Sequence, residues 1–269
     1  MTNLYHKLVP IEDEFLRNLK RQWFSKNNEH VELPKYLKLA TEWFLSSRLI
    51  DIEGVNQYPY ADVIMGCTHY IESFILKYGW QGFQILEDEY AYYRVMGKHG
   101  VEVDQLEEGK PLIISLPNWK FGDIRPDFDQ VLKVCEQRNI DIHIDMAWLT
   151  TAADVSIDVG HPNVKSFAMS LSKYAMQWNR IGVRWTRQRT VDSVTIFNQY
   201  YGDVNTALAS CGYYMMNNVP RDYAWDTYRE KYYRLCNDLD LQPTKCIQVV
   251  RKSGVDLPYG IADLLVRKL

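Results

Sequence analysis

The chain has 269 residues, 46% of them hydrophobic and 24% charged, which are ordinary values for a globular protein that can bury a full core. Its net charge of −3 and the absence of a basic run argue against a nucleic-acid partner. No apolar run reaches membrane-spanning length, and residues 1–4 do not begin a signal peptide. The five cysteines are scattered and show neither a disulfide framework nor metal-ligand spacing. We therefore expect a cytoplasmic protein that binds no metal, membrane or nucleic acid.

Hydrophobic periodicity predicts that the chain opens with helices over residues 11–25 and 35–50. From residue 61 onward, short apolar runs alternate with amphipathic ones, a pattern typical of a mostly parallel sheet flanked by helices. The predicted strands cover residues 62–65, 83–86, 101–103, 111–116, 140–145, 164–169 and 181–186. Helices are predicted again over 203–217 and 221–238, and a short apolar run covers 246–250.

Several of these strands end in residues that can bind a ligand. The first runs through Gly66 into a helix, whose free N–H groups and positive dipole end suit a phosphate. The strand over 140–145 ends in Asp145, and carboxylates at such strand ends point into the ligand crevice of open α/β sheets. The strand over 111–116 breaks at Pro117 and Asn118, a composition also found in ordinary turns.

The most informative segment is Ser170-Leu171-Ser172-Lys173, which follows another strand and is followed by Arg180. A lysine between small hydroxyl residues is suited to covalent chemistry with an aldehyde, although a single lysine at a strand end is most often a solvated surface residue.

This segment resembles the lysine loop of the fold-type I pyridoxal-phosphate (PLP) enzymes, the class I/II aminotransferases in particular. The resemblance implies that Lys173 forms the internal aldimine with PLP and that Ser170, Ser172 and Arg180 bind the cofactor phosphate. Arg180 follows the lysine by seven positions, whereas the family pattern usually has eight.

Further segments resemble the same family in the same chain order. By this resemblance Asp145 pairs with the pyridinium nitrogen of PLP, and Asn118 donates to its phenolic oxygen. Trp148 stands where the family commonly has a tyrosine that contacts the same oxygen.

The remaining cofactor contacts implied by the resemblance come from residues nearer the start of the chain. Tyr90 stacks on the pyridine ring. Cys67 and Thr68 bind the phosphate at the start of the helix.

The resemblance covers roughly residues 56–220, so we expect a three-layer PLP-binding large domain there. An N-terminal helical segment (1–55) and an abbreviated C-terminal domain (221–269) would form a small helical appendage.

The resemblance implies an aminotransferase-like enzyme that moves an amino group between an amino acid or amino sugar and an oxo acid, with Lys173 as the general base. Decarboxylation, racemisation and elimination use the same groups, and motifs that bind the cofactor do not choose between these reactions. A reduced family member that acts as a binding or scaffold protein is a further alternative, as is an unrelated α/β fold.

Relatives of this class form homodimers in which the neighbouring subunit completes the phosphate pocket. The candidates for that contribution are Tyr58, Tyr60, Tyr200, Tyr201 and Asn205. Family members also grip the substrate carboxylate with a C-terminal arginine, for which Arg251 and Arg267 lie in the right region, although either could be a solvated surface residue.

Overall fold

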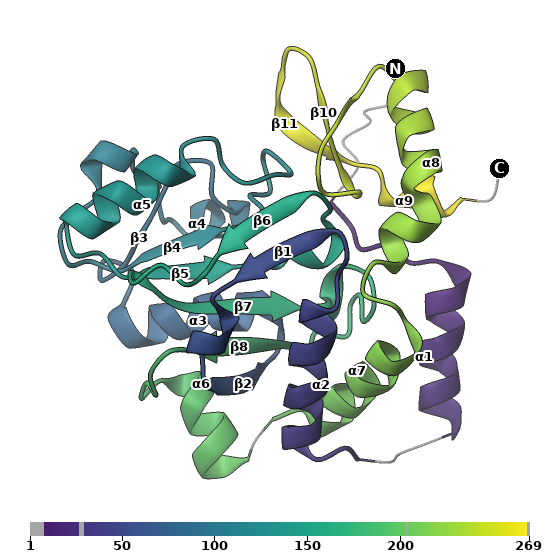
Figure 1. Ribbon diagram of the computed structural model, residues 1–269, viewed down its shortest axis with the longest axis horizontal. Coiled ribbons are helices and arrows are strands. Elements are labelled where there is room, and N and C mark those ends of the chain that lie inside the picture. Colours follow the sequence, from purple (N-terminus) through teal and green to yellow (C-terminus); the bar gives the residue numbers. More distant parts are fainter. Residues whose placement is uncertain (1–7, 27–29, 203, 268–269) are drawn as a thin grey trace.

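The computed structural model describes residues 8–26, 30–202 and 204–267, so the expectation about a signal peptide at residues 1–4 lies outside the described residues. In this part of the chain the central sheet has six strands in the order β2-β8-β7-β5-β4-β3 (Figure 1). The strands are β2 (Tyr60–Ile64), β3 (Gln84–Ile85), β4 (Leu112–Ser115), β5 (Ile142–Asp145), β7 (Val164–Ser170) and β8 (Gly182–Thr186). Because β8 is antiparallel to both of its neighbours and β3, β4, β5 and β7 pair in parallel, the sheet is mostly parallel, as predicted.

Two hydrophobic clusters, one on each face of the sheet, make the fold three-layered. Leu112 and Ile114 of β4 belong to the larger cluster, whereas Ile113 between them belongs to the smaller one. This alternation follows from the two-residue period of a strand. On the larger cluster, Phe44 of helix α2 (Leu33–Leu45) stacks on Trp185 of β8 with ring centroids 5.2 Å apart. Helix α3 (Gly66–Tyr78) covers the opposite face through residues such as Phe74.

The other helices surround these layers. They are α1 (Glu14–Lys26), α4 (Ala91–Val95), α5 (Phe128–Gln137), α6 (Ser193–Ile196), α7 (Thr206–Asn218), α8 (Tyr223–Asp238) and α9 (Ala262–Val266). Figure 1 shows α1, α2 and α7 side by side, and α7 packs against both of the other helices. Among the described helices, none combines the length and the apolar character needed to cross a bilayer.

Two small sheets were not predicted. Strand β1 (Ile50–Glu53) pairs in parallel with β6 (Val155–Asp158), about a hundred residues later. Strands β9 (Gln242–Pro243), β10 (Val249–Lys252) and β11 (Val255–Gly260) form an antiparallel sheet beside α8 (Figure 1). The C-terminal appendage is therefore not purely helical. Only the second half of the apolar run over 246–250 becomes strand.

Two predicted elements were wrong. Residues 101–103 form no strand, because Val101 makes only an isolated bridge with Leu86 and a capping box then starts a 3-10 turn at Val103–Gln105. The helix predicted over 35–50 ends at Leu45, and the N–H groups that follow find partners outside the helix. The Asp222 carboxylate accepts the N–H of Arg48 at 2.8 Å, and the Ser47 hydroxyl accepts those of Leu49 and Ile50 at 3.1 and 3.2 Å.

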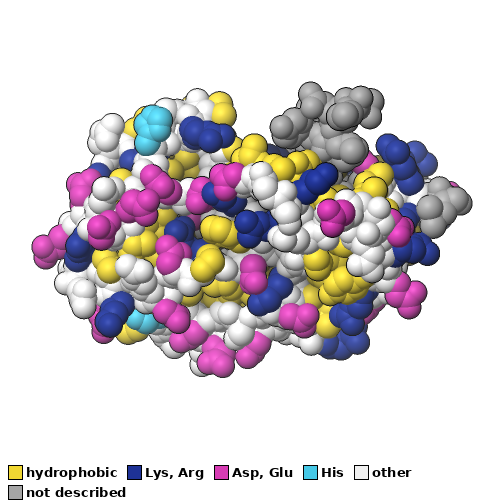
Figure 2. All heavy atoms as spheres, turned by 90° about the horizontal axis from the view of Figure 1, so that it is seen from above, with side chains coloured by type: hydrophobic (Ala, Val, Ile, Leu, Met, Phe, Trp, Pro, Cys, Tyr) yellow, Lys and Arg dark blue, Asp and Glu magenta, His cyan; other side chains and the backbone are white. Residues whose placement is uncertain are grey.

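Figure 2 views the molecule from above, toward the small C-terminal sheet and α8. On this face acidic and basic side chains are interspersed, with hydrophobic side chains exposed between them. The described residues contain no group of three His, Cys, Asp or Glu side chains that could hold a metal ion.

Candidate active site

The chain segment that carries Lys173 is fixed by contacts from both ends of the sequence. A single 3-10 turn, Leu171–Lys173, follows β7, and the Ser170 hydroxyl accepts the N–H of Ser172 at 3.2 Å. The carbonyl of Lys173 accepts the N–H of Ile11 at 3.0 Å and the side-chain amide of Gln248 at 2.6 Å. These contacts fix the lysine backbone at the end of the strand.

The ammonium group of Lys173 lies 3.7 Å from the ring centroid of Trp148, so it packs on the indole face. Burial lowers the pKa of Lys173 to about 8, although the carboxylate of Asp145 opposes this shift. With that pKa about a tenth of the lysine is unprotonated at pH 7, which is the nucleophilic form of an amine.

Asp145 lies at the end of β5, buried on the α3 side of the sheet. Its carboxylate accepts the N–H of Ala147 at 2.8 Å. Burial raises the pKa of Asp145, while a hydrogen bond from the Cys67 thiol and the positive charges of Lys173 and Arg180 act in the opposite direction. A cationic group of a ligand would stabilise this buried carboxylate further.

Gly66, at the start of α3, forms the floor of a cradle of hydrogen-bond donors. Its φ is +74°, and a β-carbon there would lie 3.3 Å from both the Ser170 hydroxyl and the Nε of Arg180. The guanidinium of Arg180 donates to the Thr68 hydroxyl at 2.5 Å, and the hydroxyls of Ser170 and Ser172 are 2.7 Å apart. A helix N-terminus, three hydroxyls and a guanidinium thus converge at one point, which suits a phosphate dianion.

These side chains enclose one small cavity of about 30 Å³. It is lined by Cys67, Thr68, Tyr90, Ser115, Trp119, Asp145, Ala147, Trp148, Ser172, Lys173 and Arg180. The structure therefore brings together most of the residues predicted from the sequence, and Ser170 contributes from the adjoining cradle. This volume is about a tenth of that of an ordinary ligand pocket, so a ring-sized ligand requires some of the lining side chains to move aside.

Asn118 is the exception among the predicted site residues. It does not line the cavity. Its side chain instead donates to the carbonyl of Asp88, which is distant in the sequence, at 3.2 Å, and accepts the N–H of Lys120 from the same turn at 2.8 Å. The next residue, Trp119, lines the cavity instead, as does Ser115 at the end of β4. Their positions after a buried strand were the only sequence signal that could have indicated them.

The candidates for completing a neighbouring subunit's site differ in exposure. Tyr58 is buried, and its hydroxyl donates to Val159 and Val164 of its own chain, so it is not free for that role. Tyr200 is 75% exposed. Tyr60 lies under the guanidinium of Arg189.

Asn205 caps α7 by accepting the N–H of Leu208 at 2.9 Å, and the side chain of Tyr201 lies outside the described residues. The C-terminal arginines Arg251 and Arg267 do not line this cavity.

The donor set fits PLP in its chemistry. The cradle at Gly66, which a β-carbon would fill, matches a phosphate, and the buried Asp145 carboxylate matches a protonated ring nitrogen. Lys173 offers an amine between these two groups in the same cavity.

The chain has the fold of the aminotransferases and related fold-type I enzymes, as the resemblance in the sequence implied. The methionine aminotransferase YbdL of Escherichia coli matches with a TM-score of 0.63 and 15% identity over 91% of this chain and 75% of that one. Aspartate aminotransferase of Thermus thermophilus, solved with maleate, matches with a TM-score of 0.62 and 13% identity over 90% and 74%. The PLP-bound C-S lyase of Staphylococcus hominis matches with a TM-score of 0.57 and 10% identity over 90% and 72%.

At these identities the similarity establishes the fold and leaves the reaction to be argued from the site. No protein-family model and no curated protein matches the sequence.

Proposed function

We propose that this protein is a PLP-dependent enzyme that transfers an amino group between an amino donor and an oxo acid. The observation that carries the proposal is the meeting of Lys173, Asp145 and Arg180 in one cavity at the ends of neighbouring strands. The solved structures with the same fold that are described as aminotransferases support transamination as the reaction.

Each of these groups has a task in this chemistry. When bound, PLP supplies an aldehyde that condenses with a primary amine and a ring that accepts the electron pair of the broken bond. Lys173 would hold the cofactor through its amine and would move the proton at the carbon next to the transferred nitrogen. Asp145 would keep the ring nitrogen protonated. Arg180 and the cradle at Gly66 would bind the phosphate.

The test is optical and covalent. Purified protein given PLP should turn yellow, and borohydride should remove the visible band and leave a reduced label on Lys173. The variant Lys173→Met is the control that should take up no label. A wild-type protein that stays colourless at saturating PLP, or a label on another lysine, would reject the proposal. Loss of the visible band on adding an amino donor, with appearance of the aminated cofactor, would identify transamination.

A different reaction of the same cofactor is the second candidate, because the same fold occurs in a PLP-bound C-S lyase and in an L-threonine-O-3-phosphate decarboxylase. Analysis of the products distinguishes them, since only a decarboxylase releases carbon dioxide and only a lyase releases a fragment of the donor side chain.

The non-enzymatic candidate, a binding or scaffold protein, is favoured by the small volume left around Lys173, about 30 Å³. It predicts a colourless protein that takes up no PLP, so the optical test above decides between it and the enzyme.

We also propose that the protein is a homodimer. Large apolar side chains stand exposed next to the cradle, with Trp178 of the lysine loop 67% exposed and Met65, just before Gly66, 52% exposed. Exposed apolar groups of this kind mark interaction surfaces. Light scattering on the purified protein tests the assembly.

We further propose a cytoplasmic location, which the five cysteines support because they are unpaired thiols.

A further inference from the structure

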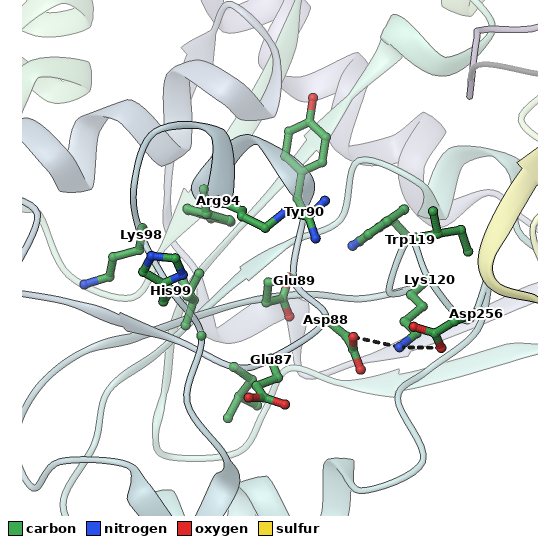
Figure 3. Close-up of a pocket in the computed structure, with 15 residues that line it drawn as sticks. Glu87, Asp88, Glu89, Tyr90, Arg94, Lys98, His99, Trp119, Lys120 and Asp256 are labelled. Carbon is green, nitrogen blue, oxygen red and sulfur yellow. Dashed lines mark hydrogen bonds and ion pairs between the residues drawn. The ribbon is translucent and has the colours of Figure 1, made fainter. Parts of the chain in front are cut away.

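A pocket of about 480 Å³ lies between the last turns of α3 and the starts of β5 and β7, at the opposite end of these strands from Lys173. We call it the α3 pocket. The pocket drawn in Figure 3 adjoins the Lys173 cavity, because Tyr90 and Trp119 line both spaces, and so belongs to the candidate active site. Among the described residues, the α3 pocket shares no lining residue with either of them. Its volume is typical of a small-molecule site.

The floor of the α3 pocket is polar, although it lies on a buried face of the sheet. His143 of β5, Ser166 of β7 and Thr186 of β8 lie side by side, because the strand register pairs Ser166 with both of the others. All three side chains are buried. His143 precedes Asp145 by two positions, so this row faces α3 as Asp145 does. Polar groups on a face that packs in the core need hydrogen-bond partners.

The hydrogen bonds of this row leave one donor for a ligand. Tyr70 is buried, and the partner of its hydroxyl among the described residues is the Ser166 hydroxyl, 2.6 Å away. A buried hydroxyl proton requires an acceptor, so Tyr70 donates to Ser166, and Ser166 donates in turn to Nδ1 of His143 at 2.7 Å. Burial, assisted by nearby cations such as Lys77, lowers the pKa of His143 to about 3, so the ring is neutral at pH 7.

A neutral imidazole carries one N–H, and because Nδ1 of His143 accepts, the proton is on Nε2. No acceptor for this N–H is found among the described residues. His143 lines the α3 pocket, so a ligand in the pocket can accept its proton.

The rim of the α3 pocket carries positive charge that carboxylates do not neutralise. Lys77 is exposed, forms no ion pair among the described residues and lies 4.8 Å from the ring centroid of Tyr78. It belongs to the last turn of α3, where it offsets the negative end of the helix dipole. Arg187 donates to backbone carbonyls and to the side-chain amide of Gln57, all of them neutral acceptors.

The acidic side chains of the α3 pocket already have partners. Asp192 accepts a hydrogen bond from the buried guanidinium of Arg184 at 2.6 Å. Asp141 lies 3.4 Å from the ammonium of Lys165, and both side chains are about half exposed, so this pair is weak. The pocket is therefore positively charged in a chain whose net charge is −3.

We propose that the α3 pocket is a second ligand site, which binds the phosphate ester of a small molecule. The Nε2–H of His143 donates to the phosphate at the floor, and Lys77 and Lys165 supply charge beside it, as lysine does in many phosphate sites. The organic part of the ester lies along Phe74 and Tyr78, whose stacked rings line the same pocket with centroids 5.9 Å apart. This site is separate from the cradle at Gly66 and does not depend on PLP.

AMP is the probe, titrated calorimetrically into the purified protein at low salt, with adenosine and inorganic phosphate as its two halves. The wild type should bind AMP more tightly than either half by about fivefold or more. Affinity for adenosine equal to that for AMP would exclude the anion contact, and equal affinity for inorganic phosphate would exclude an ester. Absence of AMP binding overturns the proposal.

Variants locate the binding. Lys77→Gln and Lys165→Gln should each weaken AMP binding by about threefold or more, the scale of one hydrogen bond. Lys133→Gln removes an exposed lysine of α5 outside the pocket, so it is the matched control for net charge and should change the affinity by less than about twofold. The binding that Lys77→Gln weakens should persist in Arg180→Gln. Wild-type affinity in Lys77→Gln, or AMP binding that is lost in Arg180→Gln and therefore lies in the cradle, overturns the proposal.

The donor role of His143 has its own readout. NMR of isotope-labelled histidine side chains should show a neutral His143 ring with its proton on Nε2, and AMP should shift this resonance. A proton on Nδ1, or a resonance that AMP leaves in place, contradicts the hydrogen bond from His143 to the phosphate.

Discussion

Replacing Gly66 by alanine tests whether the start of α3 is a phosphate site. The structure predicts two separate effects of this one methyl group. The first is strain, because Gly66 has a φ of +74° and an L side chain in the left-handed region costs about 1 to 2 kcal/mol. The second is steric, because the new β-carbon would lie 3.3 Å from both the Ser170 hydroxyl and the Nε of Arg180.

The other end of the same helix offers a matched control. Gly79, which follows the last residue of α3, has a φ of +67° and nothing within 4 Å of an added β-carbon. Gly79→Ala therefore adds backbone strain without the contact, and because the ψ of Gly79 is 168°, in a region that essentially only glycine adopts, its strain is at least as large as that of Gly66→Ala. Gly66→Ala should lose roughly 2 to 8 °C in Tm, the shift that 1 to 2 kcal/mol produces in a chain of this size, and Gly79→Ala should lose at least as much.

The two variants should differ in cofactor binding. In Gly66→Ala the methyl group occupies the cradle and forces Arg180 or Ser170 to shift by a few tenths of an ångström, and the loss of one charge-assisted hydrogen bond to the phosphate weakens PLP binding by about tenfold or more. Absorbance titration with PLP, with inorganic phosphate as competitor, measures this. Gly79→Ala should bind as the wild type does. If both alanine variants retain wild-type affinity for PLP and for phosphate, the cradle at Gly66 is not the phosphate site.

Three further substitutions follow from the buried charges. Lys173→Met should raise the Tm at pH 7, because burial lowers the pKa of the lysine to about 8 from 10.5. The energetic cost of the buried ammonium is complete below pH 8 and disappears toward pH 10.5, so the Tm values of the variant and the wild type should converge there. Parallel curves of Tm against pH for the two proteins would refute this prediction. Asp145→Asn should retain PLP but lower kcat by roughly 100-fold or more, as expected for the loss of a preorganised charge, and unchanged turnover would exclude the assigned role. The Arg184 guanidinium lies 2.6 Å from the buried carboxylates of both Asp62 and Asp192, and Arg184→Met leaves these two groups without their partner. The variant should lower the free energy of unfolding, measured by urea denaturation, by about 3 to 5 kcal/mol. A variant as stable as the wild type would show that the network is not stabilising.

The strands and the polar groups at their ends could be predicted because their signals are local. A strand buried on both faces of a parallel sheet reads as a short apolar run, which β4 shows most clearly, whereas β5 and β7 carry polar residues such as His143 and Lys165 within the run. Asp145 ends β5, and the lysine loop follows β7 directly. The C-terminal ends of neighbouring parallel strands meet at one edge, so these positions were predictable without knowledge of the packing.

The side-chain directions within a turn could not be predicted in this way. Asn118 and Trp119 are adjacent, and both follow the strand that ends at Ser115. The turn residue that faces the cavity depends on the backbone path, which here directs Asn118 back toward Asp88 and Trp119 toward the lysine. Composition identifies such a turn, but it does not specify which of its side chains points inward.

Contacts between distant segments set the remaining limit, and Lys173 illustrates it best. Its carbonyl is bonded by Ile11 near the start of the chain and by Gln248 near the end, so segments outside the region of family resemblance position the group on which the chemistry depends. Neither residue carries a motif, because a backbone N–H and a side-chain amide occur in every part of the sequence. The identity of the reactive lysine was thus readable from a local pattern, whereas the contacts that hold it over Asp145 and Trp148 exist only in the folded chain.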